Sequence, residues 1–212
     1  MPSDYSPNWF NQDRLLSEQM NRLQSDETGL GHVWEIIPTY THIAWYNELH
    51  HFPSEMAKKY AKGDGYNAKP VLQFTYQFTT NNNAVTPGNT TNLYTPMFDI
   101  LRGKFDVHFR KLARDIKAYE QPVLFRLNNE MNTDWTSYCG MMTLNDPEIF
   151  NMTWRYLFNI FKQEGVDNAL WIWNPAHTSI PYSNWGEDLT YFPGKEYVHI
   201  LGLTHYEMNN RD

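Results

Sequence analysis

The chain has 212 residues, of which 41% are hydrophobic, 16% aromatic and 19% charged, so it can bury the core of one globular domain and does not have the composition of a disordered segment. Its formal net charge is -7 and its sequence contains no run of like charge, which argues against nucleic acid as a partner. The single cysteine excludes an internal disulfide, and no stretch approaches the run of about 20 apolar residues that a membrane span needs.

The first half of the chain predicts two helices and two strands. Apolar spacing indicates a helix over residues 13–23, and a strand-like run follows over residues 32–45, where Pro38 indicates a bend or a sheet edge. A second helix is expected over residues 53–62. Residues 69–80 are rich in strand-forming residue types.

The second half continues the alternation of helix and strand. An apolar stripe predicts a helix over residues 105–116, and a short apolar strand follows over residues 122–127. A longer helix is predicted over residues 146–165, with Asp-Pro as its start signal and Gly as its stop. The last predicted elements are two strands over residues 168–175 and 197–207.

This alternation predicts an α/β fold with a parallel sheet, because a crossover helix is what makes consecutive strands parallel neighbours. No strand is followed by a glycine-rich phosphate loop, which removes the main support for a nucleotide-binding open sheet. Polar and aromatic residues gather instead after the strand ends, where a (β/α)8 barrel keeps its active site. They are Gln77 and Asn81, together with residues 128–135, 173–177 and 206–210.

Glu130 follows the apolar strand of residues 122–127, so a parallel strand would carry it to the carboxyl edge of the sheet. Its neighbours Asn128, Asn129 and Asn132 offer neutral hydrogen bonds. A carboxyl group among amides and rings, with few cations near, is expected to keep its proton part of the time at neutral pH and to act as a general acid. The pattern leaves a second interpretation open, in which Glu130 caps a helix or is solvated in a loop.

The segment PVLFRLNNEMNTDW, residues 122–135, resembles the acid/base segment of glycoside hydrolase family 26, the β-mannanase family. The family pattern has Pro-Val, an apolar pair with Arg, then His-Glu-Met-Asn-Gly and a Trp two residues on. The matching residues are Pro122, Val123, Arg126, Glu130, Met131, Asn132 and Trp135. The segments LRGKFDVHFRKLARDIKAYEQ, LWIWNP and YFPGKEYVHILGLTHYE also resemble family segments in the family's order, so the resemblance covers about residues 33–208.

The resemblance implies a (β/α)8 TIM-barrel fold and a retaining glycoside hydrolase in which Glu130 is the general acid/base. Two positions depart from the family pattern. Asn129 stands where the family usually has His, and Thr133 stands where it has Gly. The broader clan of retaining barrel glycosidases uses Asn before the catalytic Glu, so the first departure bears on the subfamily and the substrate more than on the reaction.

The predicted strands correspond to strands two to six of such a barrel, so residues 1–212 are expected to form a single, incomplete barrel domain. A typical barrel of this type needs about 250 residues. The family's nucleophile, a Glu at the end of strand seven, is then expected to lie outside this chain. Glu207 is an alternative nucleophile, but we interpret it as a loop acid and assign Tyr206 the family's role of hydrogen-bonding the nucleophile.

Further residues near the strand ends are predicted to contact substrate. Asn129 is placed in the substrate site beside Glu130, and the rings of Trp135, Tyr138 and Trp173 are expected to stack on sugar faces. His177 is positioned to hydrogen-bond sugar hydroxyls. Packing in the core, or a hydrogen-bonded loop histidine, remains the alternative for these residues.

His50, His51 and Glu55 have a spacing that could suggest a metal, but a surface helix often carries such pairs by chance and no third ligand is evident, so neither a metal nor another cofactor is assigned. The resemblance implies a polysaccharide or oligosaccharide substrate such as mannan, cleaved by endo attack. It also implies an extracellular enzyme, although the first ten residues show no secretion signal. The alternative function is that of a carbohydrate-binding barrel protein without catalytic activity.

Overall fold

The computed structural model describes residues 25, 29, 31, 35–45, 48–49, 51–54, 70–80 and 95–206. Its strands are β1 (Ile36–Trp45), β2 (Glu48–Leu49), β3 (Val71–Thr80), β4 (Val123–Leu127), β5 (Ala169–Trp173) and β6 (Ile200–Leu201). Its α-helices are α3 (Met97–Leu101), α4 (Asp106–Lys117) and α5 (Pro147–Gln163). Short 3-10 helices are η2 (Gly140–Met142), η3 (Asp188–Tyr191) and η4 (Lys195–Tyr197).

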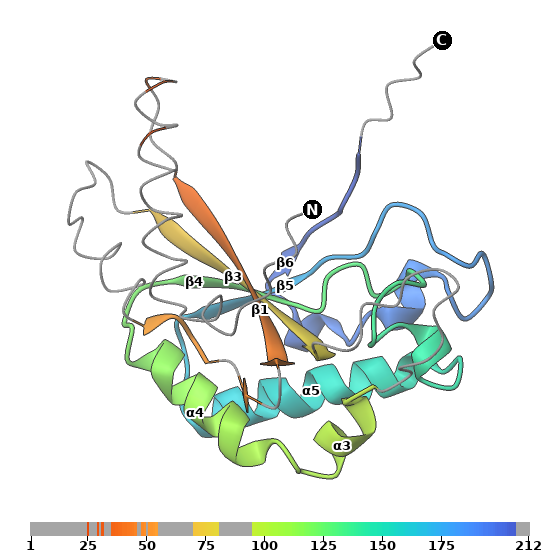
Figure 1. The fold of residues 1–212 in the computed structure, drawn as a ribbon, viewed down its shortest axis with the longest axis horizontal. Coiled ribbons are helices and arrows are strands. Elements are labelled where there is room, and N and C mark those ends of the chain that lie inside the picture. The colour runs from red at the N-terminus through yellow and green to blue at the C-terminus, as the bar shows by residue number, and fades with distance from the viewer. Residues whose placement is uncertain are drawn as a thin grey trace, which may run out of the picture.

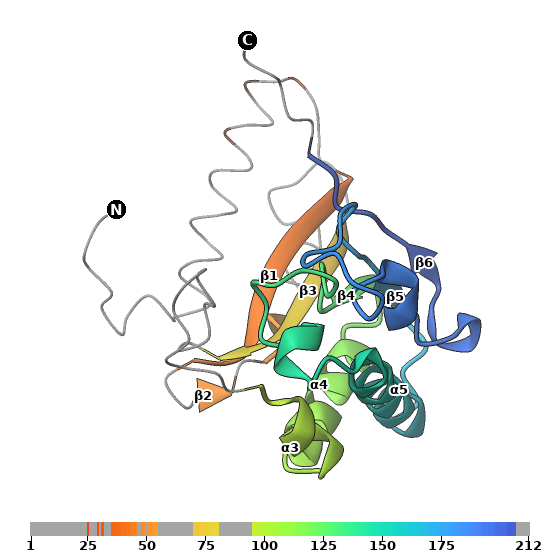
Figure 2. The same cartoon turned by 90° about the vertical axis from the view of Figure 1, so that its right-hand side faces the viewer.

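The strands form one sheet in the order β2-β1-β3-β4-β5-β6. Neighbours from β1 to β6 pair in parallel, and β2 pairs antiparallel with the end of β1. Helices α3 and α4 connect β3 to β4, α5 connects β4 to β5, and all three lie on the same side of the sheet (Figures 1 and 2). The predicted α/β class with a parallel sheet is therefore confirmed.

Helix α5 begins and ends at the signals that its sequence contains. The side chain of Asp146 accepts a hydrogen bond of 2.9 Å from Glu148 N, and Pro147 lies in the first turn. Both features stabilise a helix N-terminus, since the first N–H groups of a helix have no partner within it. Gly165 follows the helix with φ of 70°, a left-handed conformation that costs glycine little.

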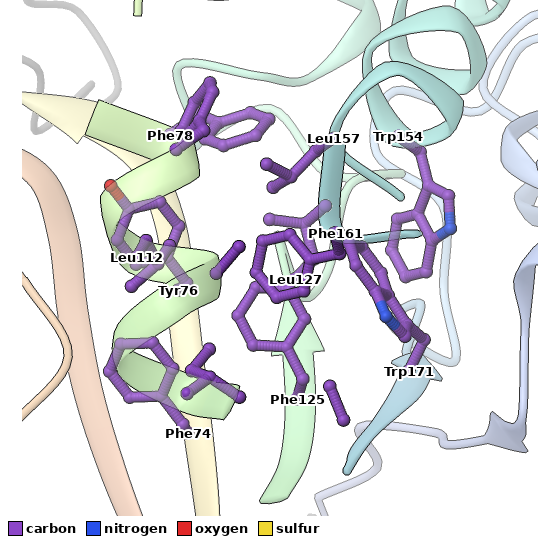
Figure 3. Close-up of a cluster of buried hydrophobic side chains, with 14 of the residues drawn as sticks. Phe74, Tyr76, Phe78, Leu112, Phe125, Leu127, Trp154, Leu157, Phe161 and Trp171 are labelled. Atoms are coloured by element: carbon purple, nitrogen blue, oxygen red, sulfur yellow. The ribbon is translucent and has the colours of Figure 1, made fainter. Parts of the chain in front are cut away.

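The core lies between the sheet and helices α4 and α5. Alternate residues of each strand point to the helices, as the two-residue period of a strand requires. The ring centroids of Phe125 and Trp171 are 4.7 Å apart, and each lies 5.1 Å from Phe161 of α5. Figure 3 shows this cluster, whose labelled members are Phe74, Tyr76, Phe78, Leu112, Phe125, Leu127, Trp154, Leu157, Phe161 and Trp171.

The opposite face of the same strands is more polar near their carboxyl ends. Thr75 and Gln77 of β3 lie on this face and are buried, and Arg126 of β4 pairs with Thr75 in the strand register. The sheet therefore has an apolar face packed against the helices and a more polar face on the opposite side.

Several elements differ from the prediction, among them β2 and the three 3-10 helices, which were not predicted. The expected strand over residues 197–207 is a strand only at Ile200–Leu201, with an isolated bridge between Ala176 and Thr204, because η4 occupies the start of the segment and its partner β5 ends at residue 173. Helix α3 was not predicted, since five residues are too few for a helical period to be read.

The predicted helix over residues 13–23 and most of the predicted helix over residues 53–62 lie outside the described residues. Within the part of the chain that is described, the helices are too short or too polar to cross a membrane.

Candidate active site

The loop that follows β4 is fixed to the carboxyl end of β3. Asn128 N donates to Tyr76 O (2.9 Å), and the Asn128 side-chain oxygen accepts from Phe78 N (2.7 Å). Further along the loop, Ser137 Oγ donates to Phe78 O (2.7 Å). These bonds continue the sheet's hydrogen bonding into the loop, so the residues between Asn128 and Ser137 are held at the sheet edge.

Glu130 is held by its backbone and keeps its side chain free of cations. Its N–H donates to Asn174 O after β5 (2.7 Å), and its C=O accepts from Thr133 N (3.2 Å) and Thr133 Oγ1 (2.7 Å). The side chain is partly exposed, and within the described ranges it makes no ion pair and no hydrogen bond. The carboxylate is therefore available to an incoming molecule.

The residues on either side of Asn129 have left-handed backbone conformations, with φ of 47° at Asn128 and 59° at Glu130. Residues other than glycine rarely adopt this region, and the strain persists only where surrounding contacts offset it. Such strain is concentrated at functional sites. Here it turns the chain sharply at the point where β4 ends.

The buried side chains of Gln77 and Tyr138 hydrogen-bond to Asn129, the residue directly before Glu130. Gln77 Nε2 donates to Asn129 Oδ1 (3.1 Å) and to Tyr138 Oη (3.2 Å), and Tyr138 Oη donates to the Asn129 carbonyl (2.8 Å). Burial raises the pKa of the Tyr138 hydroxyl well above its ordinary value, while the hydrogen bond from Gln77 opposes the shift. Tyr138 therefore stays protonated and acts as a donor.

Arg126 connects four strands on the polar face. Its Nε donates to Thr75 Oγ1 (2.9 Å), its Nη1 donates to Asn174 Oδ1 (3.0 Å), and its Nη2 donates to Tyr40 Oη. Asn174 Nδ2 in turn donates to Thr204 Oγ1 (3.0 Å). These partners are hydroxyl and amide oxygens, because uncharged residues occupy the neighbouring positions in β1 and β3 and directly after β5.

Three of the predicted substrate contacts are exposed near this edge. Trp135 is 39% exposed and Tyr206 is 69% exposed. His177 is also exposed, its N–H donates to Thr204 O (2.9 Å), and its ring centroid lies 4.5 Å from that of His205. The rings of all three are therefore accessible to a ligand.

Two predicted stacking residues are buried instead. Tyr138 is 0% exposed and Trp173 is 5% exposed, so neither ring presents a face on which a sugar can stack. Trp173 lies on the helix side of β5, where its Nε1 donates to Tyr191 O (2.9 Å) and its ring meets Phe192 at 5.3 Å. Its strand position places it on the packed face, in line with Trp171.

Asn174 and Thr204 are the polar residues whose roles the sequence reasoning missed. Asn174 follows β5 directly, and a polar residue at a strand end was the signal that marked it. Glu207, His50 and Glu55 lie outside the described residues. In the ranges that are described, no group of three or more His, Cys, Asp or Glu side chains is placed to hold a metal ion.

Comparison with known proteins connects this geometry to a family. The model of glycosyl hydrolase family 26 matches residues 64–212. Endoglucanase H of Acetivibrio thermocellus is 29% identical over 110 residues, which are 51% of this chain and 12% of that protein. The chain thus spans a small part of this curated relative.

Solved structures of low identity share the fold. The Bacillus subtilis mannanase man26 matches with a TM-score of 0.65 at 21% identity, over 88% of this chain and 59% of that one. A family 26 β-mannanase from Bacteroides ovatus matches with a TM-score of 0.55 at 15% identity, over 80% of this chain and 51% of that one.

The parallel strands β1, β3, β4, β5 and β6 with their helices are arranged as part of a (β/α)8 barrel, as predicted. The family resemblance seen in residues 122–135 is confirmed as well. Because the family model matches more than half of the chain, over residues 64–212, this chain belongs to glycosyl hydrolase family 26.

Proposed function

We propose that this chain carries part of the active site of a retaining, endo-acting glycoside hydrolase that cleaves a β-linked polysaccharide such as mannan, with Glu130 as the general acid/base. The observation that carries the proposal is the placement of Glu130 after β4. Its backbone is fixed by Asn174 and Thr133, and no cation among the described residues pairs with its carboxylate. A carboxyl group that is positioned and unpaired is suited to protonate the bridging oxygen.

The exposed residues around Glu130 support a sugar cleft. We propose that Trp135 stacks on a sugar face and that His177 and Tyr206 hydrogen-bond hydroxyls. Asn129 contacts substrate through its amide, while Tyr138 and Trp173 support the site from the interior. The mannanase names of two structural relatives, and the endoglucanase name of the curated one, support a β-linked polysaccharide as substrate.

Retaining hydrolysis needs a second carboxyl group about 5 to 5.5 Å from the first, which forms the glycosyl intermediate. We propose that this nucleophile lies outside the present chain, which matches 59% of the Bacillus subtilis mannanase. The whole enzyme is then an extracellular barrel to which residues 1–212 contribute one part of a single domain. The 212-residue chain by itself should show little hydrolysis of mannan.

Replacement of Glu130 tests the proposal in the polypeptide that joins this chain to the remaining strands. Glu130→Gln should lower the turnover of mannan by about 10²- to 10⁴-fold, since general acid catalysis contributes that much. The first step on an aryl β-mannoside with a good leaving group should fall less, because that leaving group needs no proton. Glu187→Gln, the same change at an exposed loop residue, is the matched control.

Unchanged turnover of mannan in Glu130→Gln would refute the assignment of the acid/base. Binding of mannan oligosaccharides by the unmodified polypeptide without any turnover would instead support the carbohydrate-binding alternative. The two results are distinguished by titration calorimetry and by the release of reducing ends.

A further inference from the structure

The direction of the Asn129 amide is determined by its buried neighbours. Gln77, Asn129 and Tyr138 are 6%, 4% and 0% exposed, so their polar atoms are largely shielded from water. In such a place each donor must meet an acceptor, because an unmatched buried polar atom costs about 1–3 kcal/mol. The donor and acceptor atoms of the three side chains can therefore be assigned in turn, starting from one group whose role is known.

That group is the backbone carbonyl of Asn129, whose oxygen can only accept a hydrogen bond. Tyr138 Oη lies 2.8 Å from it, so the hydroxyl hydrogen of Tyr138 is used there. The oxygen of Tyr138 is then left as an acceptor, and the group 3.2 Å away on Gln77 must be its NH2 rather than its carbonyl. The orientation of the Gln77 amide follows from the tyrosine.

The same NH2 group of Gln77 lies 3.1 Å from the side chain of Asn129, to which it brings its second hydrogen. Asn129 must therefore present Oδ1 on that side, and its Nδ2 faces the other way. Within the described part of the chain this Nδ2 donates no hydrogen bond. This Nδ2 is not among the fully buried polar atoms that lack a partner, so its two hydrogens remain open to a ligand directly before Glu130.

We propose that Gln77 is a positioning residue, which aims the Asn129 NH2 group at the sugar so that it donates to a hydroxyl oxygen next to the bond that Glu130 protonates. This inference rests on the proposed function for the nature of the ligand, but the amide orientation itself does not depend on it. With the opposite orientation, Asn129 would present an acceptor, and the site would need a donor from the sugar.

Amide proton exchange tests the orientation without any substrate. The two side-chain NH2 signals of the isotope-labelled chain are assigned by their loss in Gln77→Glu and Asn129→Asp. In the wild-type chain, the Gln77 signals should exchange about fivefold more slowly than the Asn129 signals, since only the Gln77 hydrogens are bonded and one hydrogen bond contributes about 1 kcal/mol.

Gln77→Glu is the decisive variant, because a carboxylate only accepts. The Asn129 amide should then turn its NH2 group toward residue 77, and its exchange should slow by about fivefold. Gln73→Glu is the matched control, since Gln73 lies on the same face of β3 and the structure gives its side chain no hydrogen bond. It should leave the Asn129 signals unchanged.

Slow exchange at Asn129 in the wild-type chain, or no change in Gln77→Glu, would overturn the proposal. If Gln77→Glu does not fold, the wild-type rates and the variant Tyr138→Phe test the same polarity. In Tyr138→Phe the Gln77 signals should exchange faster, and unchanged rates would count against the inference.

A second arm separates the orientation from the proposed function. Titration of the polypeptide that joins this chain to the remaining strands with a β-1,4-linked mannan oligosaccharide should shift the Asn129 NH2 signals, and should shift them less when Gln77→Glu is introduced. If the sugar shifts other signals but not these, the donor role of Asn129 is wrong. If no signal shifts while the exchange rates are as expected, the proposed function fails and the amide orientation stands.

Discussion

The side chain of Asn132 should contribute about 3 kcal/mol to the free energy of unfolding. Its Oδ1 accepts from Ala176 N (2.8 Å), and its Nδ2 donates to Ala176 O (2.9 Å) and to Ser179 Oγ (3.0 Å). The residue is 2% exposed, and these bonds join the loop after β4 to the loop after β5. Three hydrogen bonds at about 1 kcal/mol each give the expected loss in Asn132→Ala.

The loss can be measured by urea unfolding of the 212-residue chain, followed by circular dichroism. The matched control is Asn184→Ala, because Asn184 is exposed in the loop after β5 and its side chain makes no hydrogen bond within the described residues. That variant should stay within about 0.5 kcal/mol of the wild-type chain. The backbone bond from Ile180 N to Asn132 O (2.9 Å) remains in both variants.

A loss below about 1 kcal/mol in Asn132→Ala would show that water replaces the three bonds without cost, and that the two loops are not held together by this side chain. Loss of the cooperative unfolding transition would show that the stability of the chain depends on Asn132 more strongly than three hydrogen bonds explain. The expected loss of about 3 kcal/mol is therefore contradicted both by a much smaller loss and by the disappearance of the cooperative transition.

Two further predictions concern packing and pH. Gly140→Ala should lower the free energy of unfolding by about 1–3 kcal/mol, because an added Cβ would lie 2.7 Å from the ring of Trp185 and against Tyr191 Oη; an unchanged urea midpoint would contradict this. Burial, and then the charge of Lys111, lower the pKa of His51 from its ordinary value of 6.5. The folded chain therefore binds this proton less readily than the unfolded chain, and stability should fall as the pH drops below 6.5. His51→Phe should reduce that fall in thermal unfolding measured from about pH 7 to about pH 5, and an identical pH profile would refute the role of His51.

The parts of the fold that the sequence predicted are those with a local physical signal. Helix α5 has an N-cap, a proline in its first turn and a terminal glycine, and these act within a few residues. Strand β4 is a continuous apolar run that ends at a polar loop. Helix α3 has no comparable signal, and the signal over residues 197–207 predicted a longer strand than the two residues of β6.

The burial of Trp173 shows why the site was harder to predict than the fold. Its position two residues after Trp171 placed both rings on one face, yet the end of a strand also suggested a cleft. The burial of Trp173 is determined by η3, where Tyr191 O accepts a hydrogen bond of 2.9 Å from the indole N–H of Trp173. No period in the sequence indicates that this segment folds back over the strand end.

The position of Glu130 depends on residues that follow β5 and β6, in a way that only the structure reveals. Asn174 accepts the Glu130 N–H at its backbone oxygen, while its side chain accepts from Arg126 and donates to Thr204. These partners lie 48 and 30 residues away from Asn174 along the chain. Each bond limits the freedom of Asn174, so the carbonyl that holds Glu130 is itself held from two sides. A carboxylate on a loop with left-handed residues thereby gains the fixed backbone that the proposed acid/base role requires.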